Sequence, residues 1–225
     1  VMNFFKKNRY VFLKKAISKE LTKFCYDYFL LKREVHKTML QNRLISPYVE
    51  YFGKYDDNQA PNTYSHYSDI VMETLLSKLH SKMEKNTGLK LYPNYSYARI
   101  YKNGDVLERH KDRMSCEIST TINLGGDPWP IYLEPNKNIG NPKEGKKGIT
   151  FVSKNKGKKI IMEPGDMVIY RGCDLEHWRE KFKGNICAQV FLHYSDKKEK
   201  DSEKNIFDGR PHLGLCNLLN AKIVK

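Results

Sequence analysis

Two histidines and an aspartate in the second half of the chain have the residue types and the order of a metal site. His110 and Asp112 form an H-x-D, and His177 follows 67 residues later. In an extended segment, residues i and i+2 point to the same side, so the imidazole and the carboxylate of the H-x-D face one space. A histidine from a later strand can supply a third ligand. This set, two histidines and one carboxylate, is typical of non-haem Fe(II) sites with open coordination positions.

An H-x-D alone recurs by chance, so the sequence around these three residues decides whether they indicate a metal site. Here it follows a strand and the turn at residues 102–105, and further strands and the turn Glu163-Pro164-Gly165-Asp166 precede His177. The alternative to a metal site is that His110, Asp112 and His177 are unrelated surface or core residues. The ordered pattern favours the metal site.

The residue pattern changes after Gly88, where short runs of β-branched and aromatic residues alternate with residues typical of turns. Such runs predict strands. We expect them at residues 95–101, 116–124, 131–133, 149–152, 159–162, 166–170, 176–179 and 186–194. Several short strands without helices between them indicate an antiparallel sandwich or barrel.

The first 90 residues predict a short strand at 10–13 and two amphipathic helices. We expect one helix to begin near Ser18, and the other to have Ser68 as its N-cap and Gly88 at its end. The apolar stripes expected to face the core are Leu21, Phe24, Cys25, Tyr28 and Leu31 in the first helix, and Val71, Leu75, Leu79 and Met83 in the second. We interpret both helices as packing elements.

Residues 92–195 resemble the Fe(II)/2-oxoglutarate-dependent dioxygenases, in particular the prolyl-4-hydroxylase-like branch. The resemblance rests on Tyr101, the H-x-D, the turn at 163–166, His177 and the final strand Gln189-Val190-Phe191-Leu192-His193-Tyr194. It implies a mainly β fold with supporting helices (α+β), namely a double-stranded β-helix, or jelly roll, with the N-terminal helices packed on one sheet. We expect a single domain over 1–225, with an N-terminal strand and helices in 1–90, the catalytic core in 91–195 and a C-terminal extension in 196–225.

The resemblance also implies a 2-oxoglutarate site, and here the chain departs from the family. Family members hold the distal carboxylate with Lys or Arg at the start of the last strand, where this chain has Ile186. Arg179 is the best replacement, because it lies two residues beyond His177 on the same strand and a guanidinium binds a carboxylate through two hydrogen bonds. The alternative is an ion pair of Arg179 with Glu176 or Glu180.

Three further residues are candidates for co-substrate binding. Tyr101 matches the strand position from which the family's tyrosine donates its hydroxyl group to the same carboxylate. Arg99 shares the face of Tyr101, and Asn123 is a polar residue on a neighbouring strand. Plain aromatic packing of Tyr101 is the alternative.

The activity implied by the resemblance is hydroxylation of an unactivated C–H, with O₂ and 2-oxoglutarate converted to succinate and CO₂. Asp112 favours hydroxylation, because related halogenases carry a small residue in its place. The cofactor is Fe(II), with ascorbate as a further candidate. The prolyl-4-hydroxylase-like branch suggests a prolyl or other peptidyl substrate, and a small-molecule substrate is also open. The alternatives are an oxidative demethylase of nucleic-acid bases and a non-enzymatic jelly-roll binding protein.

The 225 residues carry 40 Lys+Arg against 26 Asp+Glu, a formal net charge of +14. Residues 137–159 alone hold eight lysines and one glutamate, which predicts an exposed insertion or hairpin. Only Phe151 interrupts these lysines as an aromatic residue, so a nucleic-acid partner is not favoured. Five scattered cysteines and no long apolar stretch indicate a cytoplasmic protein without a membrane span.

Overall fold

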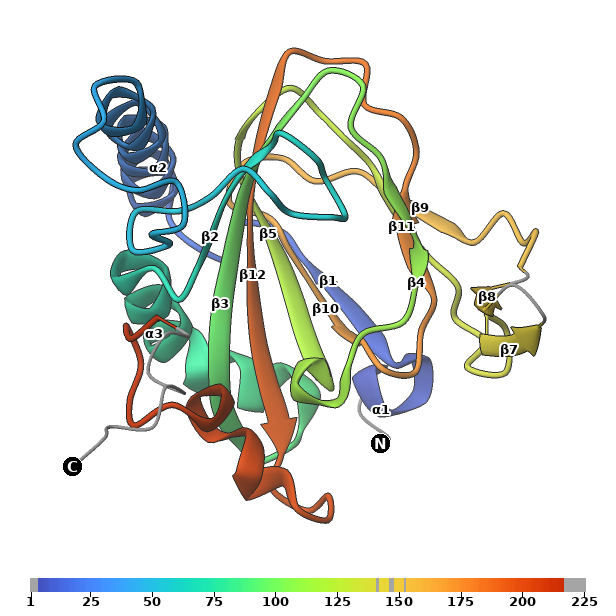
Figure 1. Ribbon diagram of the computed structural model, residues 1–225. Coiled ribbons are helices and arrows are strands. Elements are labelled where there is room, and N and C mark those ends of the chain that lie inside the picture. The colour runs from blue at the N-terminus through green and yellow to red at the C-terminus, as the bar shows by residue number, and fades with distance from the viewer. Residues whose placement is uncertain (1–3, 141, 146–147, 152, 217–225) are drawn as a thin grey trace.

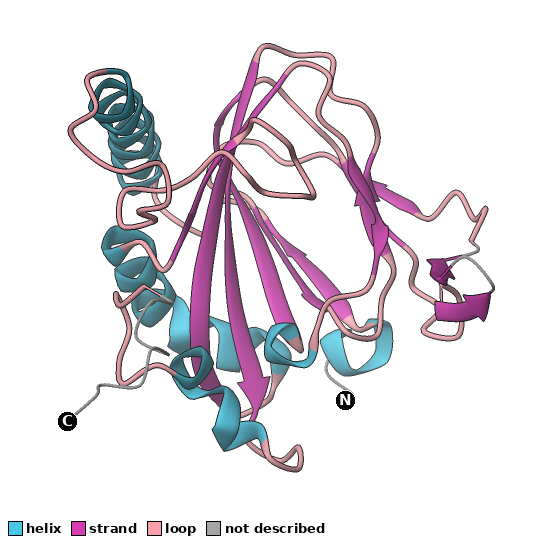
Figure 2. Ribbon diagram, viewed as in Figure 1, coloured by secondary structure: helices cyan, strands magenta, loops and turns pink. Residues whose placement is uncertain are grey.

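Two antiparallel sheets face each other in the computed structural model, which describes residues 4–140, 142–145, 148–151 and 153–216, without the side chains of 141–152 (Figures 1 and 2). The larger sheet has the order β1 (Tyr10–Leu13), β10 (Met167–Arg171), β5 (Ile118–Gly126), β12 (Ile186–Asp196), β3 (Leu91–Lys102) and β2 (Tyr64–Tyr67). The smaller sheet has the order β4 (Leu107–His110), β11 (His177–Arg179), β6 (Ile131–Leu133) and β9 (Lys158–Ile160). The predicted mainly β jelly-roll fold with supporting helices is confirmed.

The strands of the larger sheet alternate between two environments, as the period of two requires. On β12, Ala188, Val190 and Leu192 pack in the core beneath the helices, while Gln189 and His193 face the space between the sheets. The same alternation runs along β3, β5 and β10. The larger sheet therefore has a helix-covered face and a face that can carry functional side chains.

The helices α2 (Lys19–Gln41) and α3 (Ile70–Thr87) support the larger sheet, and a short α1 (Phe4–Asn8) precedes β1 (Figure 1). α2 begins next to Ser18 as predicted, and Ser18 caps it by accepting a hydrogen bond from the Leu21 amide. The predicted cap of α3 is wrong by one residue. Asp69 accepts from the Met72 amide, while Ser68 has a left-handed φ of 59°.

The apolar stripe predicted for the first helix is only partly buried. Phe24 and Leu31 are 58% and 66% exposed, whereas Thr22, Phe29 and His36 are buried. The buried face of α2 is thus rotated away from the predicted one, because it also packs against Tyr64 at the start of β2 and Tyr55 in the segment before it. The stripe of α3 is confirmed at Leu75, Leu79 and Met83.

Several elements were not expected from the sequence. They are α1, β2 and β4, together with β7 (Pro142–Gly145), which pairs with β8 (Gly148–Phe151) in a separate hairpin. The hairpin lies in the lysine-rich segment and projects from the smaller sheet at the right of Figure 1. The hairpin prediction for this segment is therefore confirmed for the backbone.

The chain after β12 continues through the short 3₁₀ helix η2 (Ser202–Gly209) and returns to α3. Arg210 donates to the Glu73 carboxylate at 2.7 Å, and both side chains are buried. The end of the predicted extension, 217–225, lies outside the described residues, and the division of the chain at 90 and 195 stays a prediction. Among the helices described, none is long and apolar enough to cross a membrane.

Candidate metal and co-substrate site

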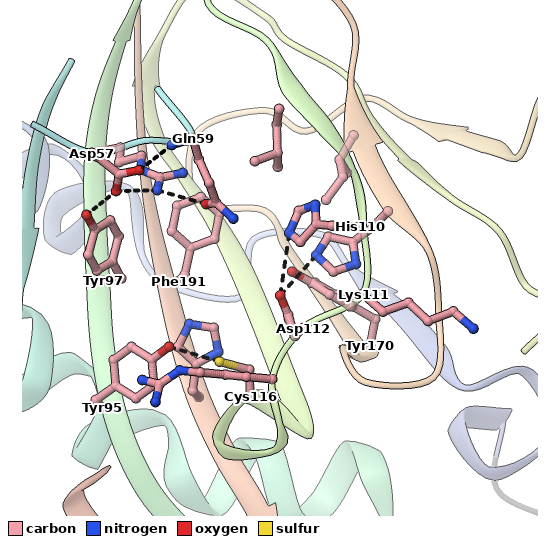
Figure 3. A pocket seen from close by; sticks show the side chains of 16 residues that line it. Asp57, Gln59, Tyr95, Tyr97, His110, Lys111, Asp112, Cys116, Tyr170 and Phe191 are labelled. Carbon is pink, nitrogen blue, oxygen red and sulfur yellow. Dashed lines mark hydrogen bonds and ion pairs between the residues drawn. The ribbon is translucent and has the colours of Figure 1, made fainter. Parts of the chain in front are cut away.

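The three predicted metal ligands meet at one edge of the space between the sheets. His110 at the end of β4 and His177 at the start of β11 are opposite partners in the antiparallel pair, with ring centroids 4.2 Å apart. The Asp112 Oδ1 atom lies 3.5 Å from His110 Nε2 and 3.4 Å from His177 Nε2 (Figure 3). The spacing H-x-D and the strand register together place one carboxylate oxygen and two ring nitrogens around a common point.

The two imidazoles are oriented by hydrogen bonds to their own strands. His110 Nδ1 lies 2.7 Å from the Glu108 carbonyl, and His177 Nδ1 lies 2.9 Å from the Leu175 carbonyl. Because a carbonyl only accepts, each Nδ1 carries a proton, and each Nε2 faces the shared point, where it can bind a metal once it carries no proton of its own. Metal-ligating histidines are held in this way. The donor set therefore fits a divalent transition metal.

Asp112 is tied to the loop after β10 as well as to the histidines. Its amide donates to the Gly172 carbonyl at 2.9 Å, and its Oδ2 accepts from the Ser119 hydroxyl at 2.9 Å. Burial alone would raise the pKa of Asp112, but the nearby His177 and His110 hold it well below its usual range. A carboxylate that stays ionised in this way is a suitable metal ligand.

A pocket of about 380 Å³ opens beside these three residues. Its opposite wall comes from the interior face of the larger sheet, and a loop between α2 and β2 covers one side (Figure 3). The strands contribute Tyr95, Tyr97, Arg99, Phe191 and His193 to this lining, and the loop contributes Asp57 and Gln59. The metal candidates thus border a cavity of the size of a small molecule or a single side chain.

Arg179 is fully buried on β11, two residues beyond His177, and is not among the residues that line the pocket. Its guanidinium donates to the Trp129 carbonyl and, at 3.3 Å, to Gln189 Oε1. Burial lowers the pKa of Arg179. Among the described residues no carboxylate pairs with it, and its Nε has no partner. A buried guanidinium without a counter-ion is costly, so an anionic ligand would stabilise this arrangement.

The alternative pairing of Arg179 with a neighbouring glutamate is not seen. Glu176 pairs with Arg109 at 3.2 Å, and Glu180 accepts from the Tyr132 hydroxyl at 3.2 Å. The position at the start of the last strand, Ile186, offers no charge, as the sequence predicts.

The other co-substrate candidates occupy three different environments. Tyr101 is fully buried, with its ring edge-on to Trp129 and its hydroxyl accepting from Arg99 at 3.2 Å. Arg99 lines the pocket and pairs with Asp57 at 2.5 Å. The Asn123 side chain binds the Met162 carbonyl at 2.8 Å and the Gly125 amide at 3.0 Å. Tyr101 and Arg99 lie between the pocket and the interior, whereas Asn123 is engaged with the backbone.

Four further residues at the site were not predicted as site residues. Ser119 and His193 lie on the strands predicted at 116–124 and 186–194, where the period of two places them on the interior face of β5 and β12. Asp57 and Gln59 line the pocket from the loop between α2 and β2. Their position depends on where this loop folds, for which the sequence carries no local signal.

No protein-family model and no curated protein matches the sequence. Similar solved structures include a non-heme alpha ketoglutarate dependent epimerase, SnoN, with a TM-score of 0.59 and 11% identity, covering 85% of this chain and 80% of that one. A Pseudomonas putida prolyl-4-hydroxylase has a TM-score of 0.52 and 12% identity, covering 86% of this chain and 95% of that one. The chain has the fold of the 2-oxoglutarate-dependent oxygenases.

A further structure with this oxygenase fold shows the ligands that the fold accommodates. HygX from Streptomyces hygroscopicus, solved with nickel and 2-oxoglutarate bound, has a TM-score of 0.56 and 12% identity, and covers 86% of this chain and 85% of that one. At these identities the likeness shows the fold alone.

Proposed function

We propose that the protein is an Fe(II)/2-oxoglutarate-dependent oxygenase that hydroxylates an unactivated C–H of its substrate. The observation that carries the proposal is the convergence of His110 Nε2, His177 Nε2 and Asp112 Oδ1 beside the pocket. These atoms would hold Fe(II) on one side and leave its other positions open. Bound iron with 2-oxoglutarate would supply the activation of O₂ that C–H hydroxylation needs.

The residues around the triad support binding of the co-substrate. Arg179 would bind the distal carboxylate of 2-oxoglutarate, since it is the buried cation without a counter-ion on the same strand face as His177. The Tyr101 hydroxyl would donate to the same carboxylate, with Arg99 beside it. In this arrangement the anion would lie between the two sheets, away from bulk water. Asn123 would act through its contact with Gln189, at 3.3 Å, which in turn holds Arg179.

The size and lining of the pocket limit which substrate group can approach the His110, Asp112 and His177 triad. Tyr97 and Phe191 provide aromatic surface across from the triad, and Arg99 and Asp57 provide paired charges (Figure 3). A volume of about 380 Å³ suits a prolyl or other peptidyl side chain, or a small polar molecule. We therefore retain both as substrate classes for the proposed hydroxylase.

Metal titration and turnover test the proposal together. The wild-type protein should bind Fe(II), measured anaerobically, and convert 2-oxoglutarate to succinate, with peptides and small molecules screened as substrates. His110→Ala and Asp112→Ala should lose metal affinity, since each removes one of three ligands. His212→Ala, an exposed histidine far from the triad in sequence, is the matched control. Unchanged metal affinity in both His110→Ala and Asp112→Ala would contradict the proposed oxygenase. The alternative, a non-enzymatic jelly-roll binding protein, would then be favoured.

A further inference from the structure

Ser119 lies at the junction of three polar groups behind the candidate metal ligand Asp112. Its hydroxyl oxygen is 2.9 Å from Asp112 Oδ2, 2.9 Å from the Cys116 carbonyl oxygen and 2.9 Å from His193 Nδ1. Ser119 is fully buried and His193 is 6% exposed. These distances are those of real hydrogen bonds rather than loose contacts.

The single hydroxyl proton of Ser119 restricts how these contacts can be satisfied. Asp112 and the Cys116 carbonyl can only accept, so the proton goes to one of them, and the charged carboxylate is the stronger acceptor. If the proton went to His193 instead, two acceptor oxygens would face the hydroxyl oxygen with no hydrogen between them. His193 Nδ1–H therefore donates to Ser119, and Ser119 donates to Asp112.

The ring of His193 is itself held in place from the opposite side. It packs against Tyr95 with ring centroids 4.4 Å apart, and the Tyr95 hydroxyl lies 2.9 Å from Cys116 Sγ. His193 also lines the pocket. The chain from His193 through Ser119 to Asp112 thus links the pocket wall to a metal ligand.

We propose that Ser119 and His193 are positioning residues, which fix Asp112 as a ligand through one oxygen, an inference that rests on the proposed function. With Oδ2 held by Ser119, only Oδ1 faces the two Nε2 atoms. Without this bond the carboxylate can rotate, because the remaining contacts of Asp112 come from its backbone amide and from the histidines. Partners of this kind commonly contribute 10- to 100-fold to metal affinity.

Anaerobic titration of the full chain with Fe(II), and with Co(II) as a stable substitute, tests the proposal. Ser119→Ala should raise the metal Kd by about 10- to 100-fold. Ser96→Ala is the matched control, because Ser96 is a fully buried serine on β3 whose hydroxyl has no partner among the described residues. It should bind metal as the wild type does.

Two substitutions at His193 separate positioning from packing. His193→Asn keeps an N–H near the place of Nδ1 and should bind metal within a few-fold of the wild type. His193→Gln moves the amide to the place of Nε2, and its affinity should fall toward that of Ser119→Ala. Thermal unfolding of each apoprotein checks that the variant folds. If Ser119→Ala is unstable, the metal affinities of the two His193 variants still test the positioning role.

The outcomes separate this proposal from the function on which it rests. Wild-type affinity in Ser119→Ala and His193→Gln, with affinity lost in His110→Ala, would overturn the positioning role and leave the metal site standing. Equal losses in His193→Asn and His193→Gln would also overturn it, since packing alone would then explain the effect. A wild-type protein that binds no metal would overturn both.

Discussion

Arg179 on β11 donates to Gln189 on β12 at 3.3 Å, which joins the two sheets in the interior. Gln189 Oε1 also accepts from Thr121 at 3.2 Å, so a neutral oxygen serves as acceptor where a counter-ion would be expected. This geometry leaves the positive charge of Arg179 without a carboxylate partner among the described residues.

Removing the charge of Arg179 should weaken 2-oxoglutarate binding without changing metal binding. Arg179→Met keeps much of the apolar side chain but loses the guanidinium, and hydrogen bonds to charged groups contribute about 1.5–3 kcal/mol each. We therefore expect the 2-oxoglutarate Kd to rise at least about tenfold, measured by calorimetry on the metal-loaded protein. Arg43→Met, at an exposed loop position, is the control. An unaltered Kd would assign the carboxylate to another cation, such as Arg99.

The ion pair between Asp57 and Arg99 should hold the loop before β2 against the pocket. Asp57→Asn leaves the buried guanidinium of Arg99 without its counter-ion, so we expect a loss of about 1–3 kcal/mol in local stability. Amide exchange of residues 54–63 should accelerate relative to the core strands. Asp56→Asn is the matched control, because Asp56 is 78% exposed and its contact with Lys54 is 3.6 Å long. Equal exchange in both variants would contradict a role of the ion pair in holding the loop.

His36 should make the protein less stable in mild acid. The ring is buried against Tyr55 and Tyr64, and neither ring nitrogen has a hydrogen-bond partner among the described residues. Burial, with the nearby His66 and Lys32, lowers the pKa of His36 below its ordinary value. The unfolded chain therefore binds the proton first, and stability falls as the pH drops through about 6.5.

Replacing this histidine tests that dependence. His36→Phe keeps the aromatic packing and removes two unsatisfied nitrogens, so unfolding free energy at neutral pH should rise by about 1 kcal/mol. The loss of stability between about pH 7 and pH 5.5 should become smaller. It should not vanish, since burial also lowers the pKa of His193 to about 4. A denaturation series over pH, with His212→Gln as control, measures both effects; an unchanged slope would contradict the prediction.

Gly172 should tolerate no side chain, because it lies against Asp112, the proposed metal ligand. A Cβ atom there would lie 2.2 Å from Asp112 Oδ2 and 2.4 Å from the Cys116 carbonyl oxygen. The clash in Gly172→Ala should therefore displace Asp112 and weaken metal binding by about tenfold or more, as much as the loss of a partner that supports a metal ligand. Gly209→Ala, where a Cβ meets nothing within 4 Å, is the control for metal affinity. Wild-type metal affinity in Gly172→Ala would show that the added methyl group is accommodated without moving Asp112.

Sequence alone determined the features that depend on local periodicity. The alternation of β5 and β12, the caps at Ser18 and Gly88 and the apolar stripe of α3 all follow from residues within one element. The H-x-D placed an imidazole and a carboxylate on one side, and the period of two predicted the inward direction of Arg179. Each of these is a matter of backbone geometry over a few residues.

Only the tertiary structure decided which elements meet. The antiparallel register of β4 and β11 sets His110 opposite His177, although 67 residues separate them in the chain. The rotated buried face of α2, the loop that brings Asp57 to Arg99 and the contact of Ser119 with His193 likewise join distant segments. Hydrophobic burial favours any close packing of apolar faces, so the choice of partner strand and register depends on the whole chain and has no local signature.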